Sequence, residues 1–333
     1  MLIPLHAPDP LLLLIAGLAI DAVFGDMPAL FRRIPHPVAL AGGAVSAFER
    51  KLNRPKRSAA ARRLRGIITV VALVAGSAAL GLAIARLCRA AGPAGTAVEA
   101  VLIGILIAQR SLFEHVAAVA SGLAGGGLAA GRDAVRHIVG RDPDSLDAHG
   151  VARAAIESLA ENYSDGVVAP AFWYLLLGLP GLFAYKMANT LDSMIGHRSA
   201  RYRVFGWAAA RLDDLLNLAP APISGALLAA AAVFAPEARA GAALRIMLRD
   251  GRRHRSPNAG WPEAAMAGAL DLALAGPRHY GGALVNDAWL GDGKARAEPA
   301  DIVRALRLYT LACQLGGGLL IGAWLATHVR LPL

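Results

Sequence analysis

A chain of 333 residues with 56% hydrophobic and only 17% charged residues departs from soluble proteins, in which about a quarter of residues are charged. This composition argues against a soluble enzyme and favours an integral membrane protein. The net charge of +10 comes mainly from arginines between apolar runs, so membrane topology and anionic headgroups explain it better than nucleic acid does. We therefore expect contact with membrane lipids and no nucleic-acid partner.

Six apolar stretches approach the roughly 20 residues that cross a bilayer core. They are residues 11–24, 67–88, 92–108, 167–188, 218–234 and 306–328. The first lacks a basic leader and a small-residue cleavage site, so we interpret it as a retained helix rather than a signal peptide. The pattern predicts an all-α fold, a polytopic integral membrane helical bundle of about six spans. We expect one multi-pass domain over residues 1–333, with cytoplasmic polar loops.

Two features bear on topology. Lys51, Arg54, Lys56, Arg57, Arg62 and Arg63 lie in one short loop. By the positive-inside rule this loop is cytoplasmic and the amino terminus lies outside. Span 167–188 contains Pro170 and the run GLPG at 178–181, which predicts a broken helix or a re-entrant helical hairpin. The Gly/Ala-rich stretch 122–131 predicts a helix junction.

The densest polar run covers residues 155–166. If it is helical, Glu157, Glu161 and Asp165 fall four residues apart along one face. Stacked carboxylates repel one another unless a cation lies among them, and Mg²⁺ typically uses one or two carboxylates plus substrate phosphates. The alternative is a solvated acidic face, but the next residues enter an apolar span directly, which favours function.

Two further polar stripes border apolar spans. Lys186, Asn189 and Asp192 are spaced by three residues on one helical face. Such groups usually face a cavity or a partner, although interfacial anchoring of Lys186 is the alternative. In the third stripe Asp213 and Asn217 are four residues apart, and Arg211 and Asp214 are placed to pair.

A basic segment follows in residues 249–263. Arg249, Arg252, Arg253, His254 and Arg255 precede the run SPNAG at 256–260 and a helix expected over 263–274 that Pro262 begins. Guanidinium groups opening onto a helix start suit phosphate binding, and a loop that only sets topology is the alternative.

Near the amino terminus, Pro35 and Pro37 hold His36 in an extended, rigid backbone. His36 could contact phosphate or take part in proton transfer, or lie there incidentally in a rigid turn.

Together these motifs resemble the adenosylcobinamide-phosphate synthase family of cobalamin biosynthesis, over nearly the whole chain. The most specific blocks are ESLAEN at 157–162 with DG at 165–166, NTLDSM at 189–194 with Gly196, ARLDD at 210–214 and SPNAG at 256–260. In one place the chain departs from the family: it has Pro222 where the family usually carries an arginine, so one contact to substrate is missing.

The resemblance implies a multi-pass enzyme of the bacterial inner membrane. It would use ATP and Mg²⁺ to join a propionate carboxyl of adenosylcobyric acid to the amine of (R)-1-aminopropan-2-ol phosphate. It also implies contact with other enzymes of the cobalamin pathway, and it fixes no oligomeric state.

On this basis we assign roles to the polar groups. The expected catalytic residues are His36, Glu157, Glu161, Asp165 and Asp192. The expected nucleotide- and phosphate-binding residues are Lys186, Asn189, Arg211, Arg252, Arg255, Ser256 and Asn258. The expected Mg²⁺ ligands are Glu161, Asp165, Asp192, Asp213 and Asp214.

Two other interpretations remain open from the residues. A membrane phospho-alcohol or prenyl transferase also combines acidic stripes with Mg²⁺, but it needs no ATP hydrolysis. A transporter or non-catalytic sensor would use broken helices and buried charges without forming a bond.

Overall fold

A computed structural model describes residues 9–139, 143–197, 199–280, 283–285 and 287–328. The chain forms two compact units. Unit 1 comprises Met1–Ala108, Ala169–Asn217 and Thr327–Leu333, and unit 2 comprises Gln109–Val168 and Leu218–Ala326. The prediction of one domain over residues 1–333 stays a prediction beside this division.

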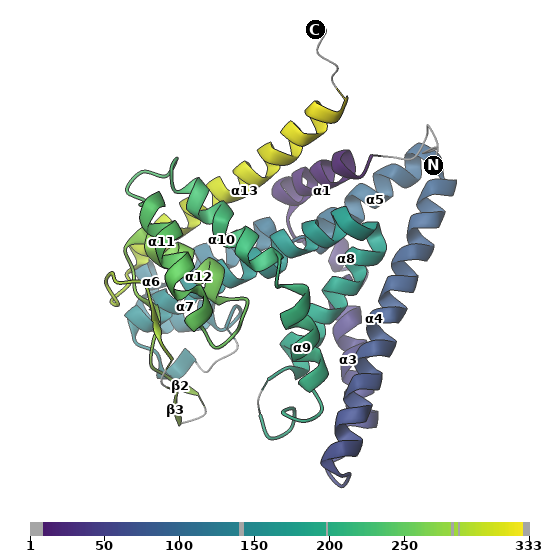
Figure 1. Cartoon of the computed structure of the whole chain (residues 1–333), viewed down its shortest axis with the longest axis horizontal. Coiled ribbons are helices and arrows are strands. Elements are labelled where there is room, and N and C mark those ends of the chain that lie inside the picture. The colour runs from purple at the N-terminus through teal and green to yellow at the C-terminus, as the bar shows by residue number, and fades with distance from the viewer. Residues whose placement is uncertain (1–8, 140–142, 198, 281–282, 286, 329–333) are drawn as a thin grey trace. The chain divides into compact units, whose positions relative to one another are not determined.

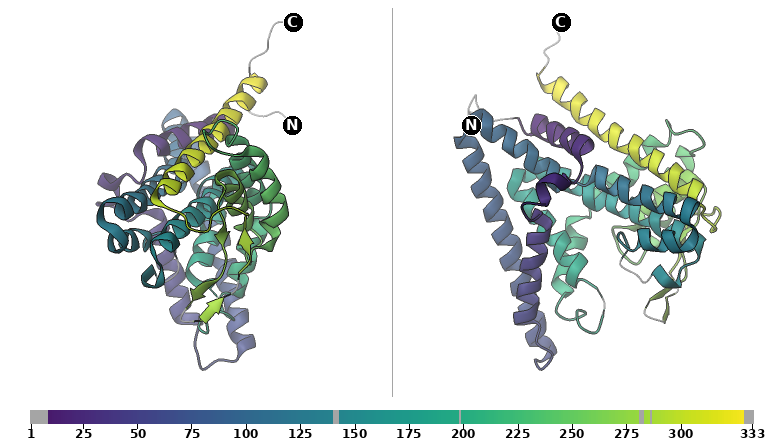
Figure 2. Two further views of the ribbon diagram at one scale, coloured as in Figure 1. Left: turned by 90° about the vertical axis from the view of Figure 1, so that its left-hand side faces the viewer. Right: turned by 180° about the vertical axis from the view of Figure 1, so that it is seen from behind.

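Unit 1 is helical. Its elements are α1 (Pro10–Phe24), α2 (Pro28–Phe31), α3 (Pro37–Leu52), α4 (Ala59–Ala90), α5 (Gly92–Leu106), α8 (Ala169–Ile195) and α9 (Trp207–Leu216). Helix starts follow local signals: the Asp9 carboxylate accepts the Leu11 N–H at 2.8 Å and Ser58 accepts that of Ala61 at 3.3 Å. Figure 1 shows α3 and α4 side by side, and the right-hand view of Figure 2 shows α1 along α5.

Small residues mark the helix crossings of unit 1. An added Cβ at Gly17 of α1 would lie 2.5 Å from Ile103 of α5, and one at Gly104 would lie 3.0 Å from the Gly17 carbonyl oxygen. An added Cβ at Gly81 of α4 would lie 2.7 Å from the carbonyl oxygen of Leu179 in α8. Backbones that approach this closely are typical of helices packed in lipid.

Unit 2 contains two helices that are buried among its other elements. Its helices are α6 (Gln109–Val135), α7 (Ala148–Tyr163), α10 (Pro220–Ala231), α11 (Ala240–Asp250), α12 (Gly260–Leu270) and α13 (Pro299–His328), with short 3-10 turns η1 (Pro143–Ser145) and η3 (Gly251–Arg253) and the π-helical turn η2 (Ser164–Val168). Most side chains of α7 and α12 are buried. Gly268 lets α12 approach the backbone of α11 at Ala242.

The expected helix over 263–274 is shifted. Helix α12 begins at Gly260, so Pro262 lies inside its first turn, and the helix ends at Leu270. The chain then forms two short antiparallel pairs, β1 (Leu274–Ala275) with β4 (Trp289–Leu290) and β2 (Arg278–Tyr280) with β3 (Ala283–Val285). Pro222 is the third residue of α10 and, like Pro262, lies in the first turn of its helix. A backbone N–H there would have no helical acceptor, so the missing N–H of proline costs no hydrogen bond.

Both predicted helix breaks are present. Gly178 in α8 has φ 66° and ψ −154°, and Gly127 in α6 has φ 69° and ψ −160°, a region that essentially only glycine adopts. An added Cβ at Gly122 would lie 3.0 Å from the carbonyl oxygen of Ala130, whereas eight residues of straight helix rise about 12 Å. An added Cβ at Gly181 would likewise overlap the carbonyl oxygen of Trp173, eight residues earlier. The chain therefore turns back at each break.

The membrane-helix class is confirmed. Four helical stretches are long and apolar enough to cross a membrane, and α9 with α10 adds a fifth if they form one bent span. The four are Ala59–Ala90, Gly92–Val135, Ala148–Ile195 and Pro299–His328, while the expected first span is α1, with only 15 residues. Large apolar side chains of α4 stay exposed, including Val71 at 60% and Leu87 at 69%, as on a lipid-facing helix. The orientation inferred from the basic loop stays a prediction.

Candidate functional site

The polar groups of unit 1 centre on Asp213 of α9. This carboxylate is only 6% exposed, and both of its oxygens accept amide N–H groups. Asn189 of α8 donates to Oδ1 at 3.4 Å, and Asn217 donates to Oδ2 at 3.1 Å. The buried Tyr185 hydroxyl donates to the Asn217 side-chain oxygen at 3.0 Å, which fixes the orientation of that amide. Asp213 is thus held between α8 and α9 as an acceptor.

Asp192 completes this group from the next turn of α8. It lies within electrostatic range of Asp213, and the two negative charges repel each other. Its carboxylate covers Gly196, where any side chain would overlap it. The predicted pair of Arg211 and Asp214 is present at 3.5 Å, so Asp214 is already engaged by a cation.

Lys186, Asn189 and Asp192 are all half-buried, so they form one partly exposed stripe of α8, as their spacing predicts. Lys186 also acts electrostatically on His36, which places these two side chains of unit 1 near each other.

His36 is the N-cap residue of α3. Its Nδ1 accepts the Val38 N–H at 3.2 Å, and its ring packs edge-on against Phe31. Burial lowers the pKa of His36 from its usual 6.5; the Asp26 carboxylate opposes this shift and Lys186 adds to it. Because Nδ1 is occupied as an acceptor, the neutral ring carries its proton on Nε2. His36 is therefore set up to donate a hydrogen bond, which favours contact with an anion over uptake of a proton.

In unit 2, part of the acidic run ties elements together. Glu157 is 5% exposed and accepts the N–H of Ala275, in β1, at 2.8 Å. Ser158 donates to the carbonyl oxygen of Ile138 at 2.7 Å, and Asn162 donates back to the Ser158 carbonyl at 2.9 Å. The side chains of Glu157, Ser158 and Asn162 therefore hold backbone groups in place.

Glu161 and Asp165 lie in different surroundings from Glu157. Glu161 is exposed and Asp165 is half-buried. The α-helix ends at Tyr163, and Asp165 belongs to the π-helical turn η2, so the expected stack of three carboxylates along one helical face is broken by the change of pitch. Single π-turns are frequent at functional sites. Ser164, in this turn, is 1% exposed, and its Oγ has no hydrogen-bond partner among the described residues.

The SPNAG run forms a tight turn before α12. The Ser256 hydroxyl accepts the N–H groups of Asn258 at 3.2 Å and Ala259 at 3.3 Å. Asn258 is 5% exposed, and its side-chain oxygen has no hydrogen-bond partner in the described part of the chain. Such a buried, unsatisfied group costs about 1–3 kcal/mol, so it is a place where a bound molecule can supply the missing partner.

The basic cluster beside this turn is partly neutralised. Arg249 bonds Asp250 at 2.6 Å and Asp292 at 2.8 Å, and Arg253 bonds Asp250 at 3.1 Å. Arg252 and Arg255 are exposed, and the Arg252 guanidinium lies 5.7 Å from the centre of the Trp261 ring. Arg249 and Arg253 thus hold the unit together, and Arg252 and Arg255 are the better candidates for binding an anion.

The predicted site residues therefore form two groups, each inside one unit. His36, Lys186, Asn189, Asp192, Arg211, Asp213 and Asp214 belong to unit 1, and Glu157, Glu161, Asp165, Arg252, Arg255, Ser256 and Asn258 belong to unit 2. Within the described ranges, no group of three or more His, Cys, Asp or Glu side chains is placed to hold a metal ion. The five-carboxylate metal site stays a prediction.

The sequence patterns did not single out one buried acid that lies inside an apolar span. Glu99 of α5 is 8% exposed and accepts a hydrogen bond from the Tyr174 hydroxyl of α8 at 3.0 Å. Its signal was available, because a lone carboxyl inside an apolar span is expensive and usually has a dedicated partner.

Comparison with known proteins identifies the family. The family model described as CobD/Cbib protein matches residues 14–309. The cobalamin biosynthesis protein CobD of a Sinorhizobium species is 52% identical over 313 residues, which cover 93% of this chain and 97% of the relative. The protein of the same name from Brucella suis biovar 1 is 53% identical over 94% of this chain and 96% of its own. One from Rhodobacter capsulatus is 48% identical over 90% and 93%.

No solved structure matches the chain. The relatives and the family model each cover nearly all of it, and they confirm the resemblance that the motifs indicate. The chain belongs to the CobD/Cbib protein family.

Proposed function

We propose that this membrane protein is the adenosylcobinamide-phosphate synthase of its bacterium, acting in the inner membrane. The observation that carries the proposal is the extent of its similarity to relatives named for cobalamin biosynthesis, about half identical over more than nine-tenths of the chain. In this reaction ATP drives formation of an amide between a propionate carboxyl of adenosylcobyric acid and the amine of (R)-1-aminopropan-2-ol phosphate.

The chemistry sets what the residues must do. A carboxylate is a poor acyl donor, so its oxygen would first take the terminal phosphoryl group of ATP, which yields an acyl phosphate and ADP. The amine nitrogen then attacks the acyl carbon, the carbon–oxygen bond to phosphate breaks, and the amine loses a proton. Both steps concentrate negative charge, which preorganised cations and donors stabilise.

The group in unit 1 suits a magnesium phosphate. Asp192 and Asp213 place two negative charges in a mostly buried setting, which a divalent cation would relieve. Asn189 and Asn217 each use one acceptor position on Asp213, and a carboxylate oxygen can accept twice, so coordination capacity remains. Asp192 and Asp213 would hold Mg²⁺, which supplies charge for the phosphoryl oxygens. Lys186 and the Nε2–H of His36 would donate to phosphate from the same unit.

The group in unit 2 suits the binding of an anion beside a hydrogen-bond donor. Arg252 and Arg255 would bind phosphate, and Ser256 holds the turn that presents Asn258. The unsatisfied oxygen of Asn258 would accept an N–H of a substrate, as the amine of aminopropanol phosphate offers. Glu161 or Asp165 would take the amine proton, because the Nδ1 of His36 already accepts the Val38 N–H and its Nε2 carries the ring proton.

Charge-removing variants test the assignment in unit 1. Asp192→Asn and Asp213→Asn should abolish amide formation in lipid bilayers while the protein still inserts and unfolds cooperatively. Asp144→Asn is the matched control, since Asp144 forms a surface pair with Arg136 at 2.9 Å and both side chains are more than half exposed. Full turnover in both Asp192→Asn and Asp213→Asn would remove the metal site from the account.

The order of bond formation is testable separately. Carboxyl oxygen-18 in adenosylcobyric acid should appear in the released phosphate if the acyl phosphate forms. A transferase would form product without ADP, and a transporter would move or bind the corrinoid without forming a bond.

A further inference from the structure

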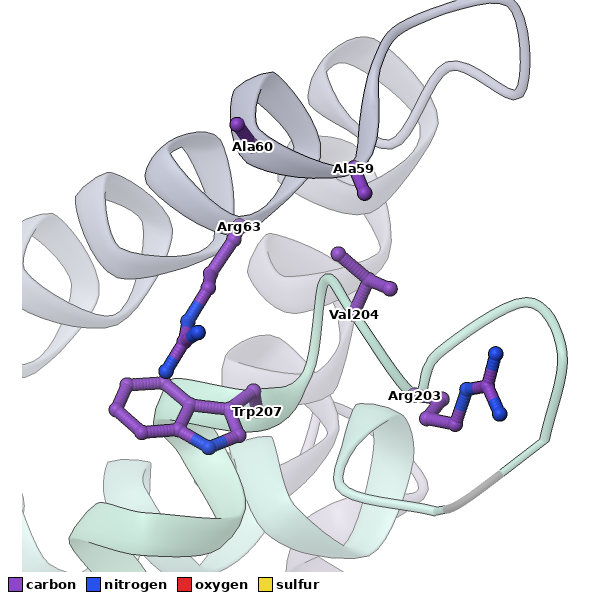
Figure 3. Close-up of a pocket in the computed structure, with 6 residues that line it drawn as sticks. All are labelled: Ala59, Ala60, Arg63, Arg203, Val204 and Trp207. Atoms are coloured by element: carbon purple, nitrogen blue, oxygen red, sulfur yellow. The ribbon is translucent and has the colours of Figure 1, made fainter.

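A pocket of about 320 Å³ lies in unit 1, apart from the residues assigned above. It is formed by the first turns of α4 and by the segment that leads into α9. Its lining residues are Ala59, Ala60, Arg63, Arg203, Val204 and Trp207. Figure 3 shows Arg63 reaching down onto the Trp207 ring, while Arg203 lies beyond Val204 with its guanidinium directed away from that ring.

The pocket lies at the depth of lipid headgroups. The apolar part of α4 runs from Ile67 to Cys88. At about 1.5 Å per residue this stretch is roughly 33 Å long and matches the hydrocarbon core of about 30 Å. Arg63 precedes it by one turn, so its side chain falls about 6 Å outside the core, where phosphates lie. Trp207 is 39% exposed beside it, as expected of an aromatic residue at the interface.

The pocket carries positive charge that the protein does not neutralise. The Arg63 guanidinium stacks 3.8 Å from the centre of the Trp207 ring. In the described residues no acidic side chain pairs with Arg63 or Arg203, whereas neighbouring Arg201 bonds Glu49 at 2.8 Å. Residues 50–65 carry eight Lys and Arg, Arg63 among them, and no acid. An anion from outside the chain fits this pattern.

We propose that this pocket binds the headgroup of an anionic phospholipid, with its phosphate at Arg63 and with Arg203 adding positive charge at the other side of the pocket. The rest of the pocket lining is apolar and suits the glycerol and the first carbons of the acyl chains. It consists of Ala59, Ala60, Val204 and the Trp207 ring. A soluble phosphate would gain nothing from that lining, and zwitterionic phosphatidylcholine brings a cation next to two arginines. The site would hold this end of α4 at a fixed depth and would make the protein selective for anionic lipid.

Lipid retention tests the proposal. The full chain is reconstituted in bilayers of equal parts phosphatidylglycerol and phosphatidylcholine, extracted gently, and analysed by native mass spectrometry for bound lipid. The wild type should retain phosphatidylglycerol selectively. Arg63→Gln with Arg203→Gln should reduce that selectivity at least about tenfold, since the pocket loses its charge-assisted hydrogen bonds to the lipid headgroup.

Two further double variants serve as controls. Arg54→Gln with Arg57→Gln removes the same charge from exposed positions of the same basic segment that do not line the pocket, and it should keep most of the selectivity. Arg63→Lys with Arg203→Lys keeps the charge but loses the planar guanidinium that stacks on Trp207, so it should retain more phosphatidylglycerol than the Gln variant and less than the wild type.

Three results would overturn the proposal. The first is equal retention of both lipids by the wild type. The second is an equal loss in the pocket and control Gln variants, which would show that the loop's overall charge acts alone. The third is displacement of phosphatidylglycerol by millimolar inorganic phosphate, which would make this a site for soluble phosphate.

Discussion

The reversal of α8 at Gly178 should be sensitive to a single added methyl group, because of its backbone conformation alone. Gly178 has φ 66° and ψ −154°, and an added Cβ would meet only Pro180, at 3.8 Å. Gly178→Ala therefore introduces no clash, and its cost is the strain of holding an L-residue in this region, about 1–3 kcal/mol. Since α8 carries Asp192 beyond the break, turnover should also fall.

The measurement is the free energy of unfolding in mixed lipid–detergent micelles, by a chemical denaturant titration. Gly43→Ala is the matched control: Gly43 lies in helix α3, and its added Cβ would have nothing within 4 Å. Alanine there should stabilise by up to about 1 kcal/mol, because it is a better helix former than glycine. The two variants should thus shift the unfolding free energy in opposite directions. Equal shifts would refute the account of the break at Gly178.

Three further predictions concern single side chains. The bond from Arg201 holds the pKa of Glu49 below its usual 4.5, so Glu49 contributes stability above pH 4.5 that is lost as the pH falls through the folded pKa. Glu49→Gln should flatten that part of an unfolding-versus-pH curve, and an unchanged curve would contradict the pairing. Arg249→Gln should lower the unfolding free energy by about 1–3 kcal/mol, because it leaves the fully buried Asp250 with fewer donors; no change would mean that the remaining donors suffice. Asn258→Ala removes the unsatisfied buried oxygen, so it should leave the unfolding free energy unchanged or raise it, yet reduce turnover about tenfold; a parallel loss of stability would mark Asn258 as structural.

The helices and their breaks followed from the sequence because the signals are local. Apolar runs of membrane length predict spans, and glycine in the runs around 127 and 178 predicts interruptions, since no other residue adopts those dihedral angles cheaply. The pairing of Arg211 with Asp214 also followed from helical spacing alone.

The long-range contacts, the short strands and the π-turn could not be predicted from the sequence. The catalytic role expected of Glu157 stays a prediction, and Glu157 also bonds the N–H of Ala275, 118 residues away, a contact that no local pattern encodes. The strands near residues 274–290 are two or three residues long, too short for a periodic signal. The π-turn at Ser164–Val168 shifts Asp165 off the expected face, and helical periodicity does not predict such a turn.

The most direct test of the central claim is the coupling of ADP release to amide formation by the wild-type protein in lipid bilayers with Mg-ATP. The account predicts one ADP per molecule of adenosylcobinamide phosphate, and release only when adenosylcobyric acid and aminopropanol phosphate are both present. Amide formation without ADP, or no turnover by a folded protein given every co-substrate, would contradict it.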